Sequence, residues 1–184
     1  EKQHDQAVAS MEKAISLNKR LFKAHYFLGK IHEAQGRPKE AAAEWSEAAR
    51  LNPGFCKAFS SLGKLYYTWD MYPQAAQVLE QGAHTARDPE DLGSINYALG
   101  MVYDAQQQYD KAIAAYLESL KDDPGSIDTK LQIGFSYADK GDKVNAKKYL
   151  EEYTKSVCTT NVENAFKLVA ANSRLRKLAA SDVQ

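Results

Sequence analysis

Apolar side chains recur along the chain with the spacing of amphipathic α-helices. In "YALGMVYDAQQQYDKAIAAY", residues 97–116, they return every three or four positions on both sides of a short polar stretch. This pattern is typical of two helices joined by a tight turn. Gly100 lies inside the first of these helices, where glycine costs about 1 kcal/mol relative to alanine. We therefore expect close packing at Gly100 to compensate for that cost.

The same pattern occurs four times. A glycine preceded by an apolar residue stands at Gly29, Gly63, Gly100 and Gly134, with spacings of 34, 37 and 34 residues. Each glycine is followed by a ring three residues later, an alanine after twelve and a large apolar residue after sixteen: His32, Tyr66, Tyr103 and Tyr137; Ala41, Ala75, Ala112 and Ala146; Trp45, Leu79, Tyr116 and Leu150. We expect the glycine and the alanine to lie where two helices nearly touch, with the larger side chains beside them.

This period and these columns resemble the tetratricopeptide repeat, a helix-turn-helix unit of about 34 residues. The resemblance implies an all-α fold, a right-handed α-α superhelix (a solenoid) with a C-terminal capping helix. We expect a single array over residues 1–184. It comprises an orphan second helix at 3–18, full repeats at 22–55, 56–89, 93–126 and 127–160, and the capping helix at 161–179.

Local signals refine the ends of these helices. Asp88 and Pro89 predict an N-terminally extended first helix in the third repeat, with Asp88 as its cap. Thr160 and Glu163 form a capping box at the start of the last helix. In that helix we expect Ala165, Leu168, Val169, Leu175 and Leu178 to form the packed stripe, with Lys167, Arg174, Arg176 and Lys177 facing water. The chain begins at Glu1 with half a repeat, so we expect the natural chain to continue upstream.

The composition gives no indication of a catalytic, metal-binding or nucleic-acid-binding site. The chain carries 24 basic and 24 acidic residues, so it lacks the basic excess of a nucleic-acid surface. Its apolar runs are far shorter than the roughly 20 residues of a membrane-spanning helix. Cys56 and Cys158 are too few for a disulfide framework or a metal cluster. His25 and His32 lie seven residues apart on one helix, too far apart to chelate one metal ion. We predict a non-catalytic protein without cofactor or metal.

We therefore expect the function to be binding of a partner by surface residues. The resemblance implies that the first helices line a concave groove. Helical geometry places four positions of each first helix on one face: Lys23, Tyr26, Lys30 and Glu33; Lys57, Ser60, Lys64 and Tyr67; Ser94, Tyr97, Met101 and Asp104; Asp128, Leu131, Phe135 and Ala138. From these we predict eleven partner-binding residues and add Trp69 at the groove edge: Lys23, Tyr26, Lys30, Lys57, Lys64, Tyr67, Trp69, Tyr97, Met101, Asp104, Leu131 and Phe135. The set favours a protein or peptide ligand with an acidic part and an apolar anchor.

Several alternatives remain open at this stage. The lysines can be merely solvated, the last helix can fold back over Leu131 and Phe135, and Trp69 can pack on Tyr72 and Pro73. The chain can also be an architectural or self-associating element, within a larger chain or a homo-oligomer. Some family members bind C-terminal carboxylates through a clamp of Lys, Asn and Arg. The corresponding residues here do not reproduce it, so we do not expect that activity: Lys23, Tyr26, Lys30, Ser61, Ser94 and Ala98.

Overall fold

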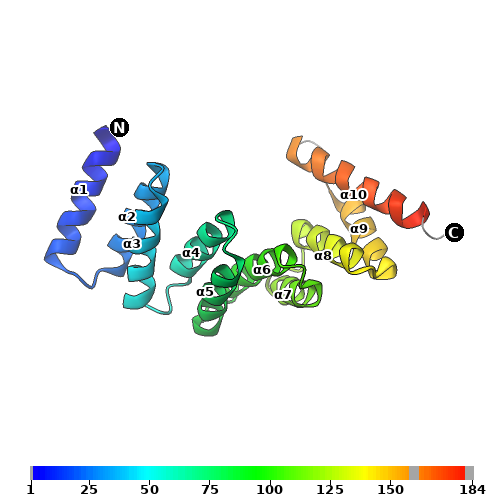
Figure 1. Cartoon of the computed structure of the whole chain (residues 1–184), viewed down its shortest axis with the longest axis horizontal. Helices are drawn as coiled ribbons and strands as arrows, with labels where there is room; N and C mark the ends of the chain where they lie inside the picture. Colours follow the sequence, from blue (N-terminus) through cyan, green and yellow to red (C-terminus); the bar gives the residue numbers. More distant parts are fainter. Residues whose placement is uncertain (1, 158–161, 181–184) are drawn as a thin grey trace. The chain divides into compact units, whose positions relative to one another are not determined.

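The protein is built from helices alone over the residues that the structure describes. The computed structural model describes residues 2–157 and 162–180, with side chains from Gln6 onward. These residues form ten α-helices and no strand (Figure 1): α1 Lys2–Leu17, α2 Phe22–Ala34, α3 Pro38–Leu51, α4 Cys56–Thr68, α5 Tyr72–Thr85, α6 Pro89–Ala105, α7 Tyr109–Asp122, α8 Ile127–Lys140, α9 Lys143–Ser156 and α10 Val162–Ala180. The predicted all-α solenoid is confirmed. No helix in this part of the chain is long and apolar enough to cross a membrane.

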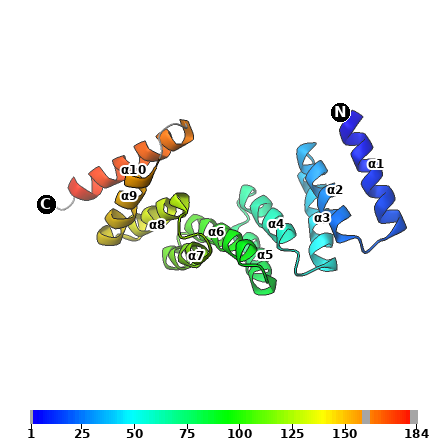
Figure 2. The same ribbon diagram turned by 180° about the vertical axis from the view of Figure 1, so that it is seen from behind.

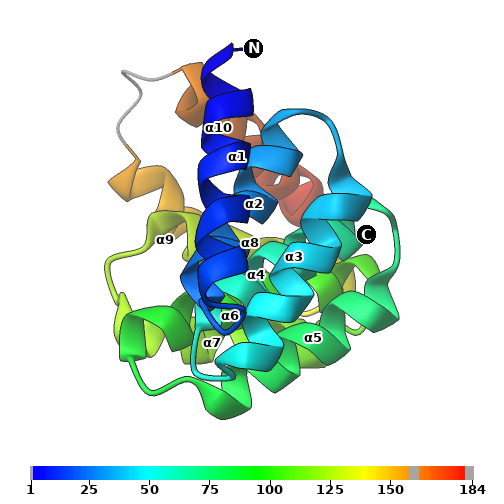
Figure 3. The ribbon, with the colours of Figure 1, turned by 90° about the vertical axis from the view of Figure 1, so that its left-hand side faces the viewer.

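The chain forms two compact units, residues 1–98 and 99–184, and their boundary falls within α6. In the first unit each helix from α1 to α5 packs on the next, and Figure 3 shows this unit from its α1 end. In the second unit α7 packs on α8 and α8 on α9. The last helix, α10, contacts both α8 and α9, as Figure 2 shows from behind.

The helical glycines make room for the large residue sixteen positions later. A Cβ atom at Gly29 would lie 2.5 Å from the indole nitrogen of Trp45, and one at Gly63 would lie 2.5 Å from Leu79. At Gly100 the added atom would run into the ring of Tyr116. The compensation expected at Gly100 is therefore real, but its nearest source is the tyrosine ring and not Ala112. Tyr116 is buried, and its ring covers the bare backbone.

The turn inside each repeat contains one residue in the left-handed region. These residues stand seven positions after the helical glycines: Gly36 (φ 70°), Asp70 (56°), Gln107 (59°) and Gly141 (90°). Glycine adopts this conformation without a steric cost, whereas Asp and Gln adopt it less readily. Each repeat thus turns by the same backbone device, although the side chain differs.

Among the helices whose preceding residue the structure describes, three begin with a side-chain cap. Asp88 Oδ1 accepts from the Glu90 amide at 3.0 Å, so α6 starts at Pro89 and is 17 residues long, which confirms its extension. Ser126 caps α8 and Asp142 caps α9, through the amides of Thr129 and Asn145. Helices α2, α3, α4, α5 and α7 lack such a bond. Thr160 of the expected capping box lies outside the described residues.

Cys56 lies at the start of α4 and is 2% exposed. Its sulfur lies 3.7 Å from the carbonyl oxygen of Gly54 and 4.0 Å from that of Gly82 on α5. Burial raises the pKa of this thiol, and Asp91 adds to the shift. Cys56 is thus a packing residue between α4 and α5.

Candidate functional site

The outer face of α2 presents an aromatic ring between two lysines. Phe27 is 53% exposed, and Lys23 and Lys30 lie exposed one turn before and one turn after it. Residues three or four positions apart share a helix face, so these three side chains form one strip, which we call the Phe27 strip. Lys30 Nζ donates to Glu33 at 2.9 Å, and this bond raises the pKa of Lys30. Lys23 has its ammonium 6.0 Å from the Phe22 ring centroid.

Tyr26, the aromatic residue expected on this face, packs inward instead. Its ring meets Phe55 edge-on at 5.0 Å between centroids and Phe27 at 5.4 Å. It is partly buried against the core formed by α3 and α4. On α2, Tyr26 thus lies partly buried against the core, and the neighbouring Phe27 is the exposed aromatic residue. No spacing signal separates the two residues, because Tyr26 and Phe27 each lie three or four positions from both Lys23 and Lys30.

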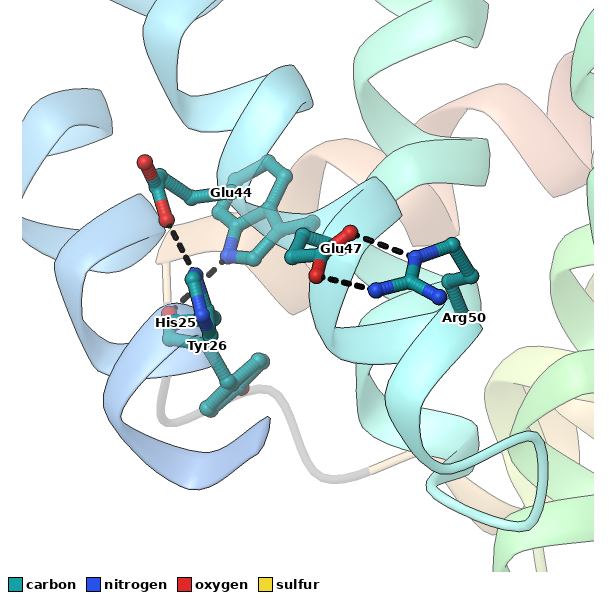
Figure 4. Close-up of polar contacts among 6 residues, drawn as sticks. His25, Tyr26, Glu44, Glu47 and Arg50 are labelled. Atoms are coloured by element: carbon teal, nitrogen blue, oxygen red, sulfur yellow. Dashed lines mark hydrogen bonds and ion pairs between the residues drawn. The ribbon is translucent and has the colours of Figure 1, made fainter. Parts of the chain in front are cut away.

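Polar bonds beneath the strip fix the position of α2 on α3. The indole of Trp45 donates to the Tyr26 carbonyl oxygen at 3.1 Å, and His25 Nδ1 lies 2.7 Å from Glu44 Oε2. Figure 4 shows His25 directed toward Glu44, with Glu47 paired to Arg50 farther along α3. Trp45 also fills the space over Gly29, so these contacts hold α2 in the orientation that leaves Phe27 exposed.

A pocket of about 500 Å³ lies on the other side of α2, next to α1. His25 and His32 line it, and one ring nitrogen of each, Nε2 and Nδ1 respectively, is buried without a hydrogen-bond partner. Both residues are buried, and His32 occupies the ring column three residues after Gly29. Among the described residues no three His, Cys, Asp or Glu side chains gather where they could hold a metal ion.

The expected residues of α4 divide into exposed and packed ones. Lys57 and Lys64 are exposed, at positions equivalent to Lys23 and Lys30 of α2. Tyr67 is partly buried and its ring lies 5.6 Å from that of Tyr72. Trp69 lies at the C-terminal end of α4, 6.1 Å from Tyr66, and packs against the cluster around Trp45 and Leu62. Packing by Trp69 is therefore observed, although its main partners are not Tyr72 and Pro73.

The three predicted binding residues of α6 are partly buried and do not form an open surface. Tyr97 and Met101 are partly buried. Asp104 accepts hydrogen bonds from Ser136 Oγ at 2.8 Å and from the Tyr116 hydroxyl at 3.0 Å. Burial raises the pKa of Asp104, and these two hydrogen bonds oppose the shift. Asp104 is mainly a packing residue of the second unit and not a freely exposed groove residue.

Helix α10 covers the face of α8 that was expected to be open. Leu131 is 1% exposed, because Leu150, Tyr153 and Ala171 enclose it. The expectation of an exposed Leu131 therefore does not hold. Phe135 is partly buried at the edge of the same cluster, and the Arg174 guanidinium lies 5.8 Å from its ring centroid. The alternative in which the last helix covers Leu131 and Phe135 describes the structure.

The orientation of α10 also departs from the expectation. Lys167 and Arg174, expected to face water, are partly buried and pair with Asp128 and Asp139 of α8. Val169, expected in the packed stripe, is 68% exposed, and Ala165 is exposed as well. Leu168, Leu175 and Leu178 pack as expected. Lys167 and Arg174 thus lie on the side of α10 that faces α8, together with the buried Ala171.

Comparison with known proteins agrees with this architecture. No curated protein matches the chain in sequence. Among solved structures, a MamA protein matches with a TM-score of 0.74 at 25% identity, over 84% of this chain and 82% of that one. Pseudomonas aeruginosa PilF matches with a TM-score of 0.76 at 19% identity, over 97% and 81% of the two chains. YrrB, described as a TPR protein with an unusual peptide-binding site, matches with a TM-score of 0.71 at 18% identity, over 92% and 86%.

Family models identify the repeat directly. Residues 1–20, 22–55, 94–126 and 128–157 each match a model described as "Tetratricopeptide repeat". These ranges hold helices α1, α2, α3, α7 and α9 and most of α6 and α8. Arrays of this repeat stack helix pairs into extended binding surfaces. The chain therefore belongs to the tetratricopeptide repeat family of protein-interaction scaffolds.

Proposed function

We propose that the protein is a non-catalytic scaffold whose first unit binds an acidic protein segment that carries an apolar anchor. The observation that carries the proposal is Phe27, 53% exposed between Lys23 and Lys30. An exposed aromatic ring in a charged surround is typical of an interaction hot spot. The apolar anchor would pack on Phe27, and the acidic groups would face the lysines.

Lysines on the neighbouring first helix support a longer contact. Lys57 and Lys64 are exposed on α4 at the positions that Lys23 and Lys30 occupy on α2. Neither forms an ion pair with any residue that the structure describes. Because exposed lysines contribute mainly to the rate and salt dependence of association, they would steer an acidic segment toward the Phe27 strip.

The proposal is tested by fluorescence anisotropy with a labelled peptide of six acidic residues around a central Leu-Phe pair. Phe27→Ala should weaken binding about tenfold or more, as expected for a central aromatic anchor. Lys23→Glu combined with Lys64→Glu should weaken binding and flatten its dependence on salt. Leu17→Ala removes a residue that is 80% exposed on α1 and serves as the control. The proposal fails if Phe27→Ala and the double lysine variant bind the peptide as the unchanged chain does.

A second candidate is self-association through the outer face of α10. Val162, Phe166 and Val169 are 72%, 73% and 68% exposed and share one helix face. Sedimentation of the chain and of Phe166→Glu distinguishes this candidate: a self-associating chain forms dimers or larger species that the variant loses.

A further inference from the structure

The α8 face of the second unit already holds a helix, and the contacts show what kind of helix it accepts. We call the surface formed by Asp128, Leu131, Phe135 and Asp139 the α8 face. Lys167 Nζ lies 2.9 Å from Asp128 Oδ1 near the start of α8, and Arg174 pairs with Asp139 near its end. The pairs follow the same order in both helices, so α10 runs in the same direction as α8. Figures 1 and 2 both show α10 lying against α8 and α9.

The centre of this contact is apolar and requires a small residue. Ala171 is fully buried, together with Leu131, Leu150 and Tyr153. It lies midway between Lys167 and Arg174, so a basic, small, basic pattern at positions i, i+4 and i+7 faces α8. Arg174 also lies over the ring of Phe135, an arrangement that attracts a cation to an aromatic face.

The fit of α10 is incomplete. A pocket of about 480 Å³ remains beside this contact, lined by Gln132, Phe135 and Asp139 of α8, by Ser173 and Lys177 of α10, and by Asp104 of α6 and Tyr109 of α7. The Arg174 Nε atom is buried without a hydrogen-bond partner. Small and polar residues of α10, Ala170 and Ser173, face this space. A helix with a larger apolar residue at the position of Ser173 would bury more surface here than α10 does.

We propose that the α8 face is a docking site for a basic amphipathic helix of a partner protein, and that α10 occupies this site in its absence. The partner helix would carry Lys or Arg at positions i and i+7, a small residue at i+4 and a large apolar residue at i+6. This goes beyond the function proposed for the first unit, because it concerns other helices and a ligand of opposite charge. A tethered helix competes at a millimolar effective concentration, so a partner must exceed α10 in contacts.

The test uses the full chain and two labelled peptides, residues 162–180 and the same peptide with Ser173→Leu. In the variant Lys167→Glu with Arg174→Glu, α10 is repelled by Asp128 and Asp139, so the site opens. This variant should bind the 162–180 peptide at least about tenfold more tightly than the unchanged chain does. The Ser173→Leu peptide should bind both proteins more tightly than the unmodified peptide.

A charge swap provides the matched control. Adding Asp128→Lys and Asp139→Lys to the opened variant restores opposite charges between α8 and α10. Binding of the 162–180 peptide should then fall back to the level of the unchanged chain or below it. A helix that binds elsewhere would not respond to this swap.

Hydrogen exchange on the unchanged chain gives a readout that does not depend on any variant folding. Saturating Ser173→Leu peptide should accelerate exchange in α10 while α8 stays protected. The proposal is overturned if the peptide leaves α10 exchange unchanged, or if the opened variant binds no better than the unchanged chain. It is also overturned if sedimentation shows that the unchanged chain dimerises by exchange of α10, since a second copy would then be the occupant.

Discussion

Asp104 is an acidic residue that packing holds in a partly buried position, where burial disfavours its negative charge. Its carboxylate is held by Ser136 and Tyr116, two neutral donors. Burial outweighs these two hydrogen bonds and raises the pKa of Asp104, and repulsion from Asp139 adds to the shift. A group with a raised folded-state pKa favours folding most when it is protonated, and this contribution is lost as the pH rises.

We therefore expect Asp104→Asn to gain stability relative to the unchanged chain as the pH rises. Below the unfolded pKa of aspartate, about 3.9, the Asp104 carboxyl is largely neutral in both states, so the two proteins should differ least there. Above it, the unfolded state of the unchanged chain ionises more readily than the folded state, which favours unfolding. Urea unfolding at a series of pH values from 4 to 8 would measure the difference. Asp122→Asn, at an exposed position on α7, is the control, and a difference independent of pH at position 104 would contradict the expectation.

Single residues also show where sequence reasoning reaches its limit. The glycine and alanine columns could be predicted because they recur with the repeat. Phe27 could not be separated from Tyr26, since neighbouring residues point about 100° apart on a helix and only the packing of α2 on α3 decides between them. The inward role of Asp104 depends on Ser136, which lies 32 residues away on α8.

At the scale of elements, helices α6 to α9 show the clearest contrast between helices that begin with a side-chain cap and one that does not. Helices α6, α8 and α9 have a side-chain acceptor at their first amides, whereas α7 lacks one. The extension of α6 could be predicted from its local sequence, because a cap acts within four residues. The rotation of α10 could not, because it depends on Asp128 and Asp139, which belong to another helix.

Removal of the α6 cap should be measurable. Asp88→Ala removes the acceptor of the Glu90 amide and should lower the free energy of unfolding by about 1 kcal/mol. Asp88→Asn retains an acceptor and should lose only a fraction of that amount. Chemical denaturation of the three proteins under the same conditions gives the comparison. An equal loss in both variants would mean that the carboxylate acts by its charge and not as a cap.

At the scale of the whole molecule, stability in a repeat protein is expected to be a sum of repeats and their nearest-neighbour contacts. The chain forms two compact units, and each has its own buried residues over the helical glycines. Damage to one unit should therefore remain largely within it. The repeat period indicates four similar helix pairs, but it does not reveal this division, which depends on how many contacts each helix makes.

Trp45→Ala tests this locality. Trp45 is fully buried over Gly29 and donates to the Tyr26 carbonyl, so its truncation should cost about 3–5 kcal/mol. Hydrogen exchange followed by mass spectrometry should show faster exchange in α2 and α3 and unchanged protection in α8 and α9. Leu150→Ala, over Gly134, should give the reverse pattern. Uniform loss of protection across both units in either variant would contradict the expectation.

The buried thiol of Cys56 has a practical consequence. Its sulfur lies against the Gly82 carbonyl of α5, so a thiol reagent reaches it only when the packing around the start of α4 opens. In a chain with Cys158→Ser, the rate of modification at Cys56 would report how often this part of the first unit opens. A comparison of that rate with the rate of global unfolding would show whether the opening is local.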